Sequence, residues 1–201
     1  MAKQITEAER AKKIEEILIK VGIDVSKKGE GALFVVTDKC KYKKLLKQKI
    51  EAFSIFEKGA EKLLLSIAMI DGAVIINHEG VVVDYGAKID APKVFRGYGT
   101  RHSAAYSASK CPDTFAILVS QEEKKIKIFK QGKLTVQIDA LEKNVAKHVV
   151  EANNVLESIG VGTLSTIGVG ALAPTLGIAV VPGIVLFGVP YYLIRKFVLN
   201  K

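Results

Sequence analysis

The sequence predicts an α/β fold, in which a mixed central sheet is flanked by helices and followed by a hydrophobic helical hairpin. Three observations lead to it: short apolar runs rich in β-forming residues alternate with helical patterns, tight turns join some of these runs while helices join others, and the C-terminal part of the chain is almost free of charge. Strands joined in both ways belong to a mixed sheet with helices on its faces. With 201 residues, 49% of them hydrophobic, the chain has room for one ordinary domain and an appendage.

The first half of the chain alternates helical patterns with one strand. Apolar residues at helical spacing predict a helix over 6–21, with Gly22 as its end. The run 31–36 is expected to be a buried strand. A second helical pattern covers 40–57 and carries many lysines, which indicate either a solvated face or a surface that attracts anionic substrate or lipid. A short helix over 61–69 follows.

The second half alternates hairpins with helices. Turn residues between apolar runs predict two hairpins, and Thr100 is expected to cap the helix between them. The expected elements are strands 73–77 and 80–89, a helix over 101–110, strands 115–120, 126–129 and 134–138, and a long helix over 139–157.

The tail differs from the rest of the chain, because no charged residue occurs from Ser158 to Ile194. Such a run is too long for one membrane span of about 20 residues and suits two short ones. Basic residues on both flanks would place both ends in the cytoplasm. We therefore expect an N-terminal helix in 1–27, a main domain in 28–157 and a transmembrane helical hairpin in 158–201, with the protein at the cell membrane. A soluble buried hairpin or a self-association segment is the alternative.

Charge and cysteine content narrow the class of protein. Thirty Lys and Arg against 21 Asp and Glu give a net charge of +9. This excess favours an anionic partner, which includes nucleotides, nucleic acids and acidic membranes, or reflects a solvated basic surface. Cys40 and Cys111 show no zinc or thioredoxin spacing. They are expected to be unpaired core residues of a protein from a reducing compartment.

Two short segments have the chemistry of a nucleotide site. Gly99 and Thr100 lead into a helix whose first turn holds Arg101 and His102. Free N–H groups at a helix start bind phosphate, and arginine holds phosphate oxygens bidentately. Asp71, at the start of a strand, suits metal binding or proton removal, although the same residue type also caps turns.

In sequence context these segments resemble the diadenylate cyclase domain, also called the DisA nucleotide-binding domain. The resemblance rests on Asp-Gly-Ala at 71–73, Gly-Thr-Arg-His-Ser-Ala-Ala at 99–105 and Val-Ser-Gln-Glu at 119–122, and it covers roughly residues 28–140. It implies the fold of that family and the condensation of two ATP molecules into 3′,5′-linked cyclic di-AMP with release of two pyrophosphates. It also implies a homodimer of domains placed face to face, in which Mg²⁺ or Mn²⁺ assists the attack of each 3′-hydroxyl on the other α-phosphate.

The resemblance also implies roles for single residues. Asp71, Arg101 and His102 would be catalytic, and Asp71 and Glu122 would bind the metal. The implied ATP-binding residues are Gly72, Ala73, Ile89, Gly99, Thr100, Arg101, His102 and Ser120. Two positions depart from the family: Ser103 replaces a second arginine that many members have, and Gln121 replaces a common glutamate. These changes would weaken the grip on phosphate and alter the metal preference.

Two other functions remain open from the sequence. One is a regulatory module that binds ATP or cyclic di-AMP without efficient turnover. The other is a nucleic-acid-binding protein, which is disfavoured because no aromatic residues are interleaved with the lysine run. His78 and His148 are expected to have structural or solvated roles.

Overall fold

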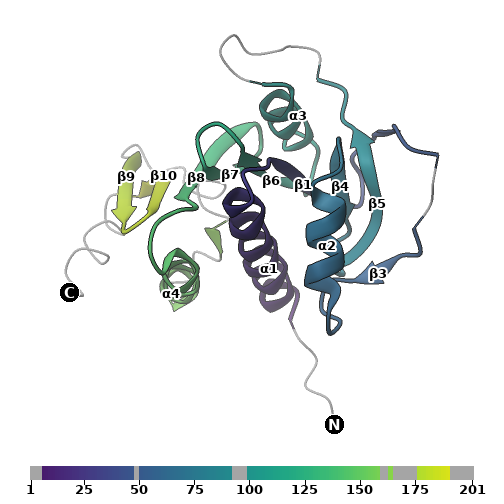
Figure 1. Cartoon of the computed structure of the whole chain (residues 1–201). Helices are drawn as coiled ribbons and strands as arrows, with labels where there is room; N and C mark the ends of the chain where they lie inside the picture. Colours follow the sequence, from purple (N-terminus) through teal and green to yellow (C-terminus); the bar gives the residue numbers. More distant parts are fainter. Residues whose placement is uncertain (1–5, 48–49, 92–98, 159–162, 165–175, 191–201) are drawn as a thin grey trace.

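A computed structural model of the chain describes residues 6–47, 50–91, 99–158, 163–164 and 176–190. Among these residues, ten strands form a single sheet (Figure 1). The strands are β1 (Ala32–Val36), β2 (Lys43–Lys44), β3 (Phe53–Ser54), β4 (Ala73–Ile76), β5 (Val81–Lys88), β6 (Phe115–Ser120), β7 (Lys125–Lys130), β8 (Lys133–Asp139), β9 (Leu176–Val181) and β10 (Ile184–Pro190). The helices are α1 (Glu7–Lys27), α2 (Ala60–Ala68), α3 (Thr100–Ala108) and α4 (Val145–Ser158).

The sheet is mixed, as the sequence predicts. Its strand order is β2-β5-β4-β1-β6-β7-β8-β10-β9, and β3 also pairs with β5. Strands β1 and β4 run parallel, with Phe34 opposite Val74, whereas the other pairs are antiparallel. The central strand β1 is buried along its whole length because both faces of the sheet are covered.

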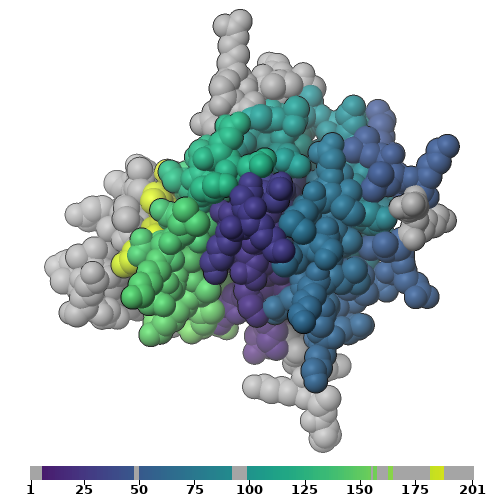
Figure 2. Space-filling view, viewed as in Figure 1, coloured from purple at the N-terminus to yellow at the C-terminus, as the bar shows by residue number. Residues whose placement is uncertain are grey.

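Helices cover the two faces unequally. On β1, Phe34 packs into the larger cluster with α1, α2 and α4, while Leu33 and Val35 pack into a smaller cluster with Ala105 and Ala108 of α3. This division follows from the alternation of side chains along a strand. Figure 1 shows α1 and α2 side by side and α3 apart from them. Figure 2 shows α1 flanked by α4 and α2 on one face of the molecule.

Helix α1 is longer than predicted, since it continues past Gly22 to Lys27. Its start is fixed by a capping box, in which Thr6 and Glu9 satisfy each other's backbone N–H groups. A Cβ at Gly22 would lie 3.1 Å from Val119 and 3.2 Å from Ile126. Gly22 therefore allows the helix to approach the sheet closely and does not end it.

The helix predicted over 40–57 is wrong. The structure places there β2 and β3, which both pair with β5. Strand β4 pairs with one edge of β5, so the opposite edge is open for β2 and β3. The Leu45 N–H donates to the Gly86 carbonyl at 3.0 Å. Pairing with an open sheet edge satisfies the backbone here and overrides the helical pattern.

Two helix starts also differ from the prediction. Gly99 is the N-cap of α3, with extended backbone, and Thr100 is its first helical residue. Helix α4 begins at Val145, after turns in which Asn144 adopts a positive φ of 62°. The other predicted strands and helices are confirmed within a few residues of their ends.

The predicted helical hairpin is wrong for residues 176–190, which form the antiparallel strands β9 and β10. This segment is rich in β-branched residues, and Gly183 turns the chain with a φ of 74°. Ile184 and Leu186 are buried in the larger core cluster, where β10 pairs with β8. The rest of the predicted hairpin lies largely outside the described residues. Among the described residues, none of the helices combines the length and apolar character needed to cross a membrane.

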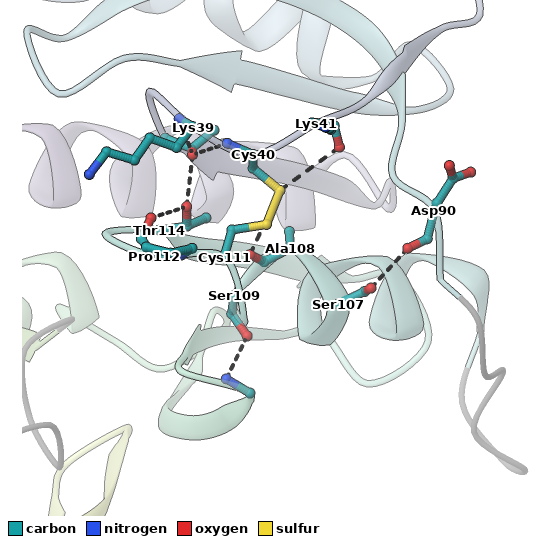
Figure 3. Close-up of a disulfide and its surroundings, with 12 residues drawn as sticks. Lys39, Cys40, Lys41, Asp90, Ser107, Ala108, Ser109, Cys111, Pro112 and Thr114 are labelled. Carbon is teal, nitrogen blue, oxygen red and sulfur yellow. Dashed lines mark hydrogen bonds between the residues drawn. A yellow bond between two sulfur atoms is a disulfide. The ribbon is translucent and has the colours of Figure 1, made fainter.

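The two cysteines are paired, contrary to the sequence prediction. Cys40 follows β1, Cys111 follows α3, and a disulfide joins them with their Cα atoms 5.6 Å apart (Figure 3). Their separation of 71 residues concealed this proximity. The bond holds the C-terminal end of α3 against the loop that leads into β2. A second contact fixes α3 to the end of β5, because the Ser107 hydroxyl donates to the Asp90 carbonyl at 2.9 Å.

Candidate active site

One cavity opens beside the first turn of α3. Its volume is about 410 Å³, within the range of about 300–1,000 Å³ that is typical of ligand pockets. The start of β4, the end of β5 and the first turns of α3 form its walls. The lining residues are Leu33, Leu45, Asp71, Gly72, Ala73, Ala87, Lys88, Ile89, Ala91, Thr100, Arg101, Ser103 and Ala104.

Two larger hollows, of about 1010 and 950 Å³, lie along the first turns of α1. Much of their charge is already paired: Arg10 contacts Glu79, and Lys39 contacts Asp113 at 2.8 Å. The start of α1 in the second hollow is closed by the capping box of Thr6 and Glu9, which leaves it poorly suited to an anion. The start of α3 has no side-chain cap and no acidic residue in its first turn, and it meets Asp71 and Arg101 in the smaller cavity. We therefore place the candidate site there.

The carboxylate and the guanidinium predicted to act together do converge. An Asp71 oxygen lies 3.5 Å from a terminal nitrogen of Arg101. The Asp71 side chain is 91% exposed and that of Arg101 34% exposed. An ion pair this accessible to water contributes little to stability, so a bound ligand can compete for either partner at small cost.

The Arg101 guanidinium lies between Asp71 and Gly31. A Cβ at Gly31 would lie 3.3 Å from one of its terminal nitrogens and 3.4 Å from Gln121. The small residue before β1 thus leaves room for the guanidinium. Within the described part of the chain, the Arg101 Nε is buried without a hydrogen-bond partner. Buried donors are nearly always satisfied, so this one fits an anionic ligand in the cavity.

Gly72 is required by the neighbouring strand as well as by the cavity. Its φ is +103°, and a Cβ there would lie 2.6 Å from the Gly86 carbonyl carbon and 2.8 Å from the Ala87 nitrogen. Any larger residue would push the end of β5 away from Asp71. The close approach to β5 is the constraint that the structure shows at Gly72.

His102 points away from the cavity, toward β7. Its Nε2 lies 3.2 Å from the Lys127 ammonium and 3.9 Å from a Glu123 oxygen. Burial, followed by the charge of Lys127, lowers the pKa of His102 below its ordinary value of 6.5. His102 is therefore neutral at pH 7, and at this position it does not add a cation to Arg101.

The remaining predicted residues are distributed around the site. Ile89, Ala73 and Thr100 line the cavity, whereas Gly99, Ser120 and Glu122 are not among its lining residues. The Ser120 hydroxyl, buried at the end of β6, accepts a hydrogen bond from the Glu123 N–H at 3.3 Å. Glu122 is exposed in the turn that follows β6. The roles of these residues in binding ATP stay predictions.

A divalent metal fits this site only if a bound nucleotide supplies part of its ligands. Among the described residues, no group of three or more His, Cys, Asp and Glu side chains is placed to hold a metal ion. Mg²⁺, however, is commonly held by one or two carboxylates together with substrate phosphates and water. The exposed Asp71 carboxylate at the cavity mouth suits that arrangement, with a nucleotide as the source of the other ligands.

The two other histidines lie outside the cavity, as expected. The His78 Nε2 is 2.7 Å from the Asp113 carbonyl oxygen, and the His148 Nδ1 is 3.3 Å from a Glu151 carboxylate oxygen. Both histidines contact residues that are not among those lining the cavity, in keeping with the structural or solvated roles expected of them.

Sequence reasoning missed several residues of the site. Leu33 and Leu45 line the cavity, although the first was read only as strand core and the second as part of a helix. Lys127 was missed as well. Lys125 and Lys127 alternate with Ile126 and Ile128, a pattern that favours a solvent-facing lysine, and the nearby Phe129 was the only local sign that Lys127 is buried.

Comparison with known proteins places the chain in a family. The family model described as DisA bacterial checkpoint controller nucleotide-binding matches residues 22–134, more than half of the chain. A diadenylate cyclase from Methanocaldococcus jannaschii is 30% identical over 145 residues, which cover 65% of this chain and 47% of the relative. A diadenylate cyclase from Haloferax volcanii is 28% identical over 142 residues, covering 61% and 51%. The chain thus spans about half the length of the curated relatives it matches.

Solved structures show a partial likeness. DacA from Staphylococcus aureus, solved as a double cysteine mutant, aligns with a TM-score of 0.44 and 25% identity, over 61% of this chain and 84% of that one. A hypothetical membrane spanning protein from Bacillus cereus aligns with a TM-score of 0.45 and 22% identity, over 60% of this chain and 61% of that one.

Proposed function

The chain belongs to the family of DisA bacterial checkpoint controller nucleotide-binding domains, and on that premise we propose that it is a diadenylate cyclase. In this reaction two ATP molecules are joined into cyclic di-AMP and two pyrophosphates are released. The observation that supports the proposal most is the meeting of Asp71 and Arg101, 3.5 Å apart, at a cavity beside the start of α3.

Each group at the cavity has a part in this chemistry. The N–H groups at the start of α3 and the Arg101 guanidinium bind the triphosphate, because both offer donors and positive charge to phosphate oxygens. A 3′-hydroxyl oxygen forms a bond to an α-phosphorus, and the bond from that phosphorus to pyrophosphate breaks. The hydroxyl proton passes to Asp71 or, through it, to water.

The Mg²⁺ or Mn²⁺ ion implied by the family would be held by Asp71 and by the phosphates. When bound, such an ion neutralises charge that builds up on the phosphate oxygens. The chain itself contributes positioning: Leu33 and Ile89 give the cavity an apolar wall, and Arg101 holds the phosphates beside the helix start.

A cyclic dinucleotide needs two nucleotides, and one cavity of about 410 Å³ suits one of them. We propose that a second copy of the chain brings the other, with the two cavities facing each other. The 91% exposure of the Asp71 side chain supports this arrangement, because a group that serves a nucleotide on a facing copy must lie at the open surface.

The test is incubation of the full chain with ATP and Mn²⁺ or Mg²⁺, followed by chromatography of the products. We expect cyclic di-AMP and pyrophosphate from the natural chain. Asp71→Asn and Arg101→Met are each expected to lower the rate by about 10²-fold or more. Asp113→Asn is the matched control, because Asp113 also forms an exposed ion pair but lies outside the cavity.

Other outcomes separate the rival functions. ATP binding measured by calorimetry without any product would favour a regulatory module. Product formation at an unchanged rate by Asp71→Asn would contradict the role of that carboxylate. Salt-dependent binding of DNA or RNA in place of ATP would favour the nucleic-acid alternative.

Location at the cell membrane, with the catalytic domain in the cytoplasm, stays a prediction from the uncharged run between Ser158 and Ile194. Carbonate extraction of membranes from cells that express the full chain tests it. Retention in the pellet is expected, and release into the supernatant would contradict an integral attachment.

A further inference from the structure

Three polar side chains form a connected group behind the first turn of α3, outside the cavity. Lys127 of β7 contacts Glu123 at 2.6 Å and the His102 Nε2 at 3.2 Å. The Lys127 side chain is 5% exposed, that of His102 13% and that of Glu123 37%. The group therefore connects the phosphate-binding turn to the interior of the sheet.

Burying a lysine at this position costs free energy unless partners compensate the ammonium group. Its neighbours Ile126 and Ile128 are fully buried on the opposite face, and Phe129 is buried on the same face as Lys127. An apolar side chain would fit this surrounding, and burial of an ammonium group is strongly unfavourable without partners. Glu123, four residues earlier, offsets part of that cost by accepting a hydrogen bond.

The contact with Lys127 determines which nitrogen of His102 carries the proton. An ammonium group has three donors and no acceptor, so the His102 Nε2 must accept. That nitrogen is then unprotonated, and the ring is neutral with its proton on Nδ1. A neutral imidazole in a single tautomer presents a fixed donor, which a freely titrating histidine does not.

The charges around the ring agree with this assignment. Burial and Lys127 lower the pKa of His102, while Glu123 and Glu122, from the turn after β6, raise it by smaller amounts. The hydrogen bond from Lys127 also lowers the pKa of Glu123. The effect of Lys127 exceeds that of either carboxylate alone, so its removal would leave burial as the main cause that lowers the pKa of His102.

We propose that Lys127, held by Glu123, is a positioning residue that locks His102 as the neutral Nδ1-protonated tautomer behind the phosphate-binding turn. Its effect on turnover rests on the proposed diadenylate cyclase activity, whereas its effect on His102 does not. Lys127 also places a positive charge next to the turn in which Ser103 stands where many members of the family have arginine.

The experiment follows the His102 ring by nuclear magnetic resonance in the free full-length chain, with His102→Gln used for assignment. In the natural chain we expect the Nδ1-protonated form and a pKa below the ordinary value near 6.5. Lys127→Met should raise the pKa of His102, because the carboxylates remain. Glu123→Gln should lower it, because one of those carboxylates is lost. Lys127→Arg should restore the behaviour of the natural chain.

Lys125→Met is the matched control: Lys125 is on the same strand and face, and its charge has only the smallest effect on the pKa of Glu123 and is not among the causes that shift the pKa of His102. The accompanying enzymatic measurement is the KM for ATP at pH 6 and pH 8. For Lys127→Met we expect a KM changed by about tenfold or more relative to Lys125→Met, with a changed pH profile.

An unchanged His102 titration in both Lys127→Met and Glu123→Gln would overturn the proposal, as would an Nε2-protonated ring in the natural chain. If Lys127→Met fails to fold, the His102 titration in Glu123→Gln decides on the proposal, because Glu123 is partly exposed. A chain that shows the expected titrations but makes no cyclic di-AMP would refute the proposed activity and leave the Lys127–His102 contact established.

Discussion

At the scale of single residues, Arg101 joins the parts of the site. It contacts Asp71, which precedes β4, and it fills the space that Gly31 leaves beside Gln121. His102, its neighbour in the chain, points the other way and contacts Lys127. Two adjacent residues of one motif thus contact different parts of the molecule, because successive side chains at a helix start diverge by about 100°.

Gly72 carries the first prediction at this scale. Gly72→Ala should destabilise the fold by at least about 2 kcal/mol, because the new Cβ would collide with the β5 backbone at a positive φ. Gly59→Ala is the matched control: its φ is +91°, yet nothing lies within 4 Å of the added Cβ. It should cost only the backbone strain, about 1–2 kcal/mol. Urea unfolding measures both, and equal losses would show that the close approach to β5 is unimportant.

At the scale of elements, the site depends on how α3 and β2 are anchored. The disulfide and the Ser107 hydrogen bond hold α3 against the loop before β2 and the end of β5. Strand β2 is short and gains a further anchor from Lys44, which contacts the buried Asp84 at 2.5 Å. Both anchors lie near cavity walls, so each affects the shape of the candidate site.

The Asp84 contact should be worth more than a surface ion pair. Asp84→Asn is expected to lower the free energy of unfolding by about 1–3 kcal/mol, since it removes the charged partner from a buried contact. Asp90→Asn, which breaks the exposed pair with Lys43 on the same strand, should change it by less than about 1 kcal/mol. Similar losses in the two variants, measured by denaturant unfolding, would contradict this ranking.

The disulfide gives a third prediction. Because it closes a loop of 71 residues, reduction should lower the free energy of unfolding by roughly 2–4 kcal/mol. Cys40→Ser combined with Cys111→Ser should show the same loss and no further change with reductant. Thiol titration of the native chain checks the pairing: two reactive thiols before any reductant is added would disprove it.

At the scale of the whole molecule, one large core and one smaller core share the sheet. The larger, covered by α1, α2 and α4, supplies most of the buried apolar area, and the smaller, under α3, supports the cavity. Strand β10 extends the larger core through Ile184 and Leu186. The C-terminal strands therefore belong to the main sheet, in the part of the tail that the structure describes.

The proposed pairing of two copies predicts how the rate depends on protein concentration. Specific activity should rise with concentration while dimers form, and then reach a plateau. Dilution series of the product assay, combined with light scattering after size exclusion, measure both quantities. A constant specific activity at concentrations where only monomers are seen would contradict a site shared between copies.

Much of the fold, and the meeting of Asp71 with Arg101 at one cavity, could be predicted from the sequence. The apolar runs determined most strands, and the motifs at 71–73 and 99–105 determined where a nucleotide would bind, because local patterning and side-chain chemistry are properties of short segments. Tertiary structure alone decided that 40–57 pairs with β5, that 176–190 forms strands, that Cys40 meets Cys111, and that Lys127 reaches His102. Each of these depends on which backbone edge or side chain is left open by residues far away in the chain, and no local pattern carries that information.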